Sequence, residues 1–129
     1  MVEAAPVIAV LDDESKMRSA LKRLLGTYGF KVESFATGDE FLAAAAQLHL
    51  PDCLLLDLHM PAPNGFDVLE SLRALGLALP IIVITGHDEW GAAQRVIDLG
   101  ASAYLLKPLA ENILIAAIKH ALSQSTHAV

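Results

Sequence analysis

The chain has 129 residues, of which 54% are hydrophobic and 5% aromatic, and its formal net charge at pH 7 is −6. This length and composition suit one domain with an aliphatic core, so we expect a single domain over residues 1–129, with its core at about 7–122 and a frayed tail at 123–129. The negative charge argues against direct binding of nucleic acid, which needs a basic face, and no apolar run approaches the ~18 residues of a membrane helix.

Five short segments predict strands, in chain order Val7–Leu11, Lys31–Phe35, Cys53–Leu56, Ile81–Ile84 and Ala103–Leu106. Four of them are continuously apolar, which is typical of parallel strands covered by helices on both faces. In the segment Lys31–Phe35, apolar and polar residues alternate, so this segment is expected at an edge of the sheet.

Five segments between and after these strands have the apolar spacing or the start and stop signals of helices. The first ends at Gly29, and the second follows a capping-box pattern at Thr37. The third opens at Asn64-Gly65, the fourth covers about 91–99, and the fifth covers about 110–123. Alternating strands and helices with right-handed crossovers predict an α/β fold with a doubly wound parallel sheet.

The sequence also indicates the compartment. Cys53 is the only cysteine and cannot form an internal disulfide, which suits a reducing environment. The first residues lack the basic segment and long apolar stretch of a signal peptide. We therefore expect a cytoplasmic protein with no membrane segment.

Polar residues follow four of the five predicted strands. The first strand ends at Asp12 and Asp13, the third at Asp57, the fourth at Thr85 and the fifth at Lys107. The carboxyl ends of the strands form the functional edge of a doubly wound sheet. We therefore expect these five side chains to converge on one rim.

These residue types suit phosphoryl chemistry. Asp12, Asp13 and Asp57 offer hard oxygen ligands for Mg²⁺ (or Mn²⁺), which keeps several waters and needs few protein ligands. An ammonium from Lys107 and a hydroxyl from Thr85 could bind the oxygens of a phosphoryl group. Asp57 could then be the nucleophile that forms an aspartyl phosphate.

Each feature also has an ordinary structural explanation. The acidic stretch from Asp12 to Glu14 alone would more often form a helix-capping turn, and Asp57 alone could open a turn toward the prolines that follow. Thr85 and Lys107 alone would be surface residues. Their joint occurrence at four strand ends favours the phosphoryl site.

With these residues in place, the chain resembles the receiver domains of bacterial two-component response regulators. The matching stretches are VLDDE, LLLDLHMPAPNG, IIVITGHDE and AYLLKPL, and the similarity extends over about 7–122. The resemblance implies the flavodoxin-like strand order 2-1-3-4-5 with five helices. It also implies that a histidine kinase or a histidine phosphotransfer protein passes a phosphoryl group to Asp57. The domain would then switch conformation to control a partner or an output domain.

The resemblance also assigns roles at the metal and the phosphoryl group. Asp13 and Asp57 would contact Mg²⁺ directly, together with the backbone carbonyl of His59, and Asp12 would act through water. The protein would be a phosphoacceptor that assists only its own phosphorylation and dephosphorylation, not an enzyme with a separate substrate.

Three further residues receive roles from the same resemblance. Thr85 and Lys107 would bind phosphoryl oxygens, and Tyr104 would be the switch aromatic that turns inward as Thr85 moves. The resemblance also implies a cis bond before Pro108, which would aim Lys107 at Asp57.

Three other functions fit the sequence less well. A flavodoxin-like cofactor binder would need a first loop rich in Ser, Thr and Gly, whereas this loop is acidic. A Mg²⁺-dependent phosphohydrolase would place its nucleophile after the first strand, with a second acid two residues on. A receiver-shaped interaction module that is never phosphorylated would not need Asp13, Asp57, Thr85 and Lys107 together.

Four residues outside the main set carry expectations of their own. His59 and His87 lie two residues beyond Asp57 and Thr85, and the resemblance to receiver domains implies that these positions tune the lifetime of the phosphorylated state, with a pH dependence expected between about 6 and 8. The alternative is that both are ordinary exposed loop residues. Ile115 is expected to lie on a dimer or partner face formed by the fourth helix, fifth strand and fifth helix. Trp90 is interpreted as a partly buried packing residue rather than as an interface hot spot.

Overall fold

The computed structural model describes residues 4–126, with side chains through residue 124. Its elements follow one another in this order: β1 Val7–Leu11, α1 Ser15–Thr27, β2 Lys31–Phe35, α2 Gly38–Ala46, β3 Cys53–Asp57, α3 Gly65–Ala74, β4 Ile81–Thr85, α4 Ala92–Asp98, β5 Ala103–Leu106 and α5 Glu111–Thr126. None of the helices in this range has the length and apolar character to cross a membrane.

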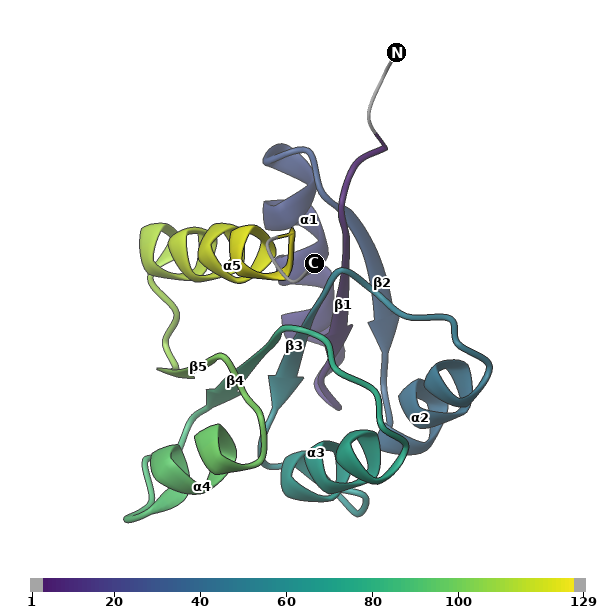
Figure 1. Cartoon of the computed structure of the whole chain (residues 1–129). Coiled ribbons are helices and arrows are strands. Elements are labelled where there is room, and N and C mark those ends of the chain that lie inside the picture. Colours follow the sequence, from purple (N-terminus) through teal and green to yellow (C-terminus); the bar gives the residue numbers. More distant parts are fainter. Residues whose placement is uncertain (1–3, 127–129) are drawn as a thin grey trace.

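The five strands form one parallel sheet in the order β2-β1-β3-β4-β5, with α1 and α5 on one face and α2, α3 and α4 on the other (Figure 1). The predicted fold is therefore confirmed. The lower apolarity of Lys31–Phe35 correctly indicated an edge strand, because β2 pairs only with β1.

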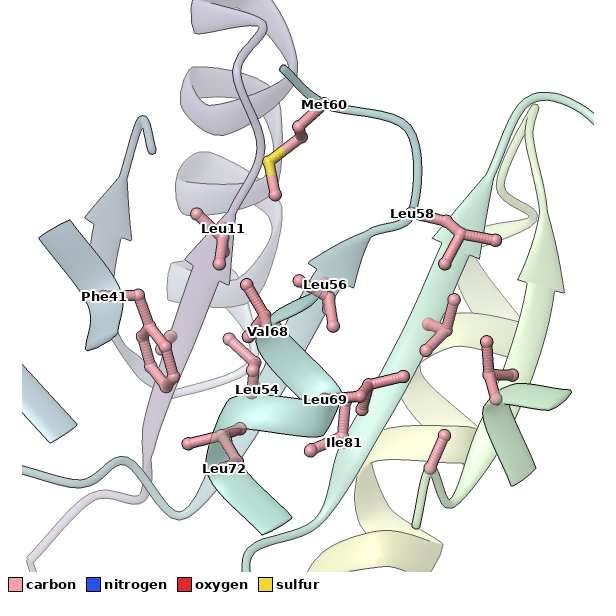
Figure 2. Close-up of a cluster of buried hydrophobic side chains, with 14 of the residues drawn as sticks. Leu11, Phe41, Leu54, Leu56, Leu58, Met60, Val68, Leu69, Leu72 and Ile81 are labelled. Carbon is pink, nitrogen blue, oxygen red and sulfur yellow. The ribbon is translucent and has the colours of Figure 1, made fainter. Parts of the chain in front are cut away.

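The sheet separates two hydrophobic clusters, because successive side chains of a strand point to opposite faces. In β1, Ile8 and Val10 face the cluster under α1 and α5, whereas Ala9 and Leu11 face the cluster under α2, α3 and α4. Figure 2 shows the second cluster, where residues of α3 pack over Leu54 and Leu56 of β3. Both faces of the central strands are thereby removed from water, which explains their continuous apolarity.

The ends of three elements differ from expectation. The fifth helix continues to Thr126, so residues 123–126 are helical instead of frayed, and residues 127–129 lie outside the described residues. The third and fourth strands each extend by one residue, to Asp57 and Thr85, so these polar side chains belong to the strands themselves.

Gly65 fixes the path of the chain from β3 into α3. Its amide donates to the carbonyl of Leu58 over 3.0 Å, and a Cβ at this position would lie 2.7 Å from Leu58 Cα and 3.0 Å from the carbonyl oxygen of Asp57. The helix then begins with a reciprocal pair of hydrogen bonds between Asn64 and Asp67. Only glycine allows this close approach of the α3 start to the end of β3.

We expect Gly65→Ala to lower the free energy of unfolding by about 1–3 kcal/mol, since the added methyl would displace backbone next to Asp57. Urea denaturation measures the change. Gly26→Ala is the matched control: this helical glycine has no atom within 4 Å of a built Cβ, so the same substitution should stabilise the protein by about 0.5–1 kcal/mol. Equal effects of the two substitutions would contradict this account.

Candidate phosphoryl and metal site

The fold brings four of the predicted site residues to the carboxyl-terminal edge of the sheet. Asp57 and Thr85 end β3 and β4, while Asp12 and Lys107 directly follow β1 and β5. The Lys107 ammonium lies 3.4 Å from Asp12 Oδ2 and 3.8 Å from Asp57 Oδ1. One cation therefore sits between two carboxylates from neighbouring strands.

These groups are largely removed from solvent. Asp12 is 3% exposed, Asp57 is 6% exposed and Thr85 is fully buried, whereas Asp13 is exposed. Buried carboxylates repel one another strongly because little water screens them. A single lysine compensates for only part of that negative charge, so a further cation near the carboxylates would stabilise this arrangement.

The pKa of Asp57 reflects this burial and repulsion. Burial is the largest cause and the Asp12 carboxylate the next, and together they raise the pKa of Asp57 to about 6. Lys107 and the backbone N–H of His59 act in the opposite direction, and Asp13 adds a smaller rise. Near neutral pH the carboxylate is therefore mainly ionised, at an energetic cost to the folded protein.

The donor set fits a hard divalent cation. Oxygen atoms of Asp12, Asp13 and Asp57 lie within 4.8 Å of one another, and carboxylate oxygens are the ligands that Mg²⁺ prefers. Asp12 is already engaged on both sides: its Oδ1 accepts the Glu14 amide at 2.9 Å and its Oδ2 faces Lys107. Asp13 is the exposed carboxylate of the three and the most accessible to a metal, whereas Asp57 also lies near Lys107 and accepts the backbone N–H of His59.

Thr85 and Tyr104 are connected to the loop that follows β4. The Thr85 hydroxyl donates to the carbonyl of His87 at 3.0 Å and accepts from the His87 amide at 3.1 Å. The half-buried Tyr104 donates its hydroxyl to Asp88 at 3.1 Å. The hydroxyl of Thr85 is therefore held by the loop and makes no direct hydrogen bond to Asp57 among the described residues.

The two histidines lie beside each other, as expected for loops that leave one edge. The rings of His59 and His87 are 5.7 Å apart and meet edge to face, and His59 Nε2 lies 3.4 Å from a carboxylate oxygen of Glu89. The Lys107–Pro108 bond has the predicted cis isomer, and Ala62–Pro63 is also cis.

The prediction for Ile115 is wrong. Ile115 is only 5% exposed and packs in the cluster under α1 and α5. At about 100° per residue, Ile115 lies only about 60° around the helix from Ile118, so the broad buried stripe of α5 includes both. The isoleucine of this helix that faces solvent is Ile113, which is 52% exposed.

The interpretation of Trp90 as a packing residue is also wrong, because its side chain is fully exposed. The residue lies in the loop after β4, beyond the part of the loop that contacts Thr85 and Tyr104. The sequence shows that Trp90 is apolar, but it does not show whether another part of the chain covers the side chain.

Sequence reasoning missed one residue that shapes the site. Arg18 Nη1 donates to the backbone carbonyl of Asp12 at 2.7 Å and so holds the acidic loop against α1. A cation near the start of a helix opposes the helix dipole. The sequence signal for this contact is an arginine near the start of a helix that directly follows an acidic loop.

The model of the response regulator receiver domain matches residues 8–119. The chain belongs to the response regulator receiver domain family of two-component systems. It is 38% identical over 122 residues to the response regulator protein TodT of Pseudomonas putida, and 34% identical over 125 residues to the transcriptional regulatory protein FixJ of Azorhizobium caulinodans. These alignments cover 95% and 97% of this chain, but only 53% and 58% of the two relatives.

Solved receiver domains share the fold. The chain matches the crystal structure of FixJ-N with a TM-score of 0.85 and 32% identity, covering 100% of this chain and 98% of that one. It matches a CheY-like receiver domain from Methanospirillum hungatei with a TM-score of 0.87 and 27% identity, covering 95% and 97%. The chain thus spans about half the length of the curated relatives it matches and nearly the whole of these solved receiver domains.

We expect Asp57→Asn to raise the free energy of unfolding by about 2 kcal/mol at pH 7.5 without divalent metal, because it removes the buried charge. The folded-state pKa lies above the ordinary value of 3.8, so this carboxyl favours folding least above pH 6 and its cost disappears as the pH falls toward 4. Urea denaturation of both proteins at pH 4, 5, 6 and 7.5 measures the difference. A gap that does not widen between pH 4 and 6 would contradict the assigned cause.

Proposed function

We propose that this receiver domain accepts a phosphoryl group on Asp57 in a Mg²⁺-dependent reaction. The donor is a histidine kinase or a histidine phosphotransfer protein, and phosphorylation switches the conformation of the domain to control a partner or an output domain. The observation that carries the proposal is the buried Asp57 carboxylate, which lies beside the Lys107 ammonium and within 4.8 Å of the acidic pair Asp12 and Asp13 at one edge of the sheet.

In this reaction an Asp57 oxygen attacks phosphorus while the phosphorus–nitrogen bond of the donor histidine breaks, and the electron pair of that bond stays on the imidazole. The ionised form of Asp57 predominates above its pKa of about 6, so the nucleophile is ready at neutral pH. Bound Mg²⁺ supplies positive charge that offsets the phosphoryl oxygens and the carboxylates.

The chain's own residues complete the charge balance. Lys107, already between Asp12 and Asp57, would bind a phosphoryl oxygen, because phosphorylation places the negative charge near Asp57 on the phosphoryl oxygens. Thr85 would bind another oxygen after releasing the His87 backbone. Because Tyr104 is connected through Asp88 to the same loop, that release is the proposed route of the conformational switch.

Asp13, Asp57 and the carbonyl of His59 are the proposed direct ligands of the metal, with Asp12 acting through water. The domain would have no separate substrate, so it would not act as an enzyme beyond its own phosphorylation and dephosphorylation. Self-association through α4, β5 and α5 stays a prediction, and the exposed large apolar residues there are Ile97, Leu106 and Ile113 instead of Ile115.

Incubation with Mg²⁺ and acetyl phosphate should add one phosphoryl group to the wild-type chain, detected by intact-protein mass spectrometry. Asp57→Asn should abolish this addition, and so should removal of Mg²⁺ with EDTA. Asp52→Asn is the control, since this carboxylate lies at the other end of β3, bonded to the Val7 amide, and its loss should leave labelling unchanged. Persistent labelling of Asp57→Asn would contradict the assignment of Asp57 as the phosphoacceptor. Steady hydrolysis of an added phosphomonoester would favour the phosphohydrolase alternative.

Replacing His59 and His87 together by Ala should change the lifetime of phosphoryl-Asp57 by severalfold, because their paired rings stand beside the residues that hold the phosphoryl group. Decay after removal of acetyl phosphate measures the lifetime. His49→Ala is the control, since His49 pairs with Glu33 on β2, away from this edge pair. Identical decay in the double variant and the parent would assign both histidines to ordinary loop positions.

A further inference from the structure

The most exposed large apolar side chain described in the structure is Trp90. Its exposed fraction is 102%, whereas the other exposed large hydrophobic residues range from 37% to 73%. It is also the only tryptophan in the chain. A tryptophan whose whole side chain stands in water has no packing role in the isolated domain, and tryptophan is the residue most enriched at interface hot spots.

The loop that carries Trp90 is held in place from its inner side. The three residues before it each make a contact: His87 with Thr85, Asp88 with Tyr104, and Glu89 with His59. Gly91 follows with a φ of +81°, a left-handed conformation that glycine adopts without strain. Helix α4 begins at Ala92, directly after Gly91, so the exposed indole lies between these loop contacts and the first turn of the helix.

The surroundings of Trp90 are acidic. An open groove beside it is lined by Asp88, Glu89, Gly91, Ala93 and Gln94, without a lysine or arginine. The Glu89 side chain is 59% exposed, so its charge faces solvent even though it contacts His59. An apolar anchor bordered by two carboxylates calls for a partner with an apolar pocket and a cationic rim.

We propose that Trp90 anchors the docking of a basic protein partner. The indole inserts into an apolar pocket of that partner, and lysine or arginine side chains around the pocket face Asp88 and Glu89. The surface is defined by Asp88, Glu89, Trp90 and Gln94, and it goes beyond the acceptance of a phosphoryl group because the indole touches neither Asp57 nor the proposed metal ligands.

A second copy of this chain fits the surface less well. A twofold pairing of Trp90 loops would bring four carboxylates together between molecules of net charge −6. Docking of Trp90 on the basic residues of α1 in another copy would be a head-to-tail contact, which builds open chains unless the rotation closes. Charge complementarity therefore favours a different, basic protein.

Two capped 14-residue peptides without tryptophan supply the probe, one amphipathic helix of Leu and Lys and its counterpart of Leu and Glu. With excitation at 295 nm, emission comes from Trp90 alone because the chain has no other tryptophan. We expect the Leu/Lys peptide to shift the emission to shorter wavelength and to protect the indole from acrylamide, and the Leu/Glu peptide to do neither.

Variants test the residues of the surface, with the affinity read from the anisotropy of the labelled Leu/Lys peptide. Trp90→Ala should weaken binding at least tenfold. Gln94→Lys should weaken binding severalfold, because it places a cation in the groove. Asp98, one helical turn further on, now accepts a hydrogen bond from Gln94 and can accept one from the lysine, so the helix should tolerate the change. Leu75→Ala is the matched control, since Leu75 is a 51% exposed residue at the end of α3 outside this groove, and its loss should leave the affinity unchanged.

Three results would overturn the proposal: unchanged affinity of Trp90→Ala, equal binding of both peptides, or self-association of the free chain in sedimentation that Trp90→Ala abolishes. Labelling by acetyl phosphate is measured on every variant. Labelling that survives in Trp90→Ala is expected, and its loss in a folded variant would overturn the assignment of Trp90 to docking alone. A wild-type chain that binds the Leu/Lys peptide but cannot be labelled would contradict the proposed function and leave the docking surface standing.

Discussion

The repulsion between Asp12 and Asp57 is the interaction on which the structure of this site depends. Both carboxylates are buried at the ends of adjacent strands, and Lys107, directly after β5, lies within 4 Å of each. An isolated buried charge would neutralise itself by changing its protonation, and the pKa of Asp57, raised to about 6, is a partial form of that response. An added cation would therefore reduce the repulsion between the two carboxylates.

The rest of the edge is arranged around this conflict. Arg18 holds the backbone of Asp12, the close approach of Gly65 sets the chain after Asp57, and the cis bond follows Lys107. The parallel sheet supplies the common edge because all its strands point the same way, and two hydrophobic clusters fix the strands below it. A rigid scaffold is what allows like charges to be kept so close.

The loop after β4 connects the acidic site to the surface of the protein. Contacts from Thr85, Tyr104 and His59 hold its inner side, so a change in the position of Thr85 must be accommodated by the same segment that presents Trp90. Contacts within a few residues therefore link the buried chemistry of the domain with its most exposed aromatic side chain.

The sequence by itself determined the alternation of strands and helices, the edge position of β2 and the presence of Asp12, Asp13, Asp57, Thr85 and Lys107 at strand ends. These follow from local apolar patterns and from a topology in which parallel strands share one edge. Only the tertiary structure decided that Ile115 is buried and Trp90 is exposed. A helical pattern gives the angle between side chains but not the width of the stripe that its neighbours cover. Likewise, the pairing of His59 with Glu89 and the grip of Arg18 on Asp12 depend on distances between separate segments, and such distances exist only once the chain has packed.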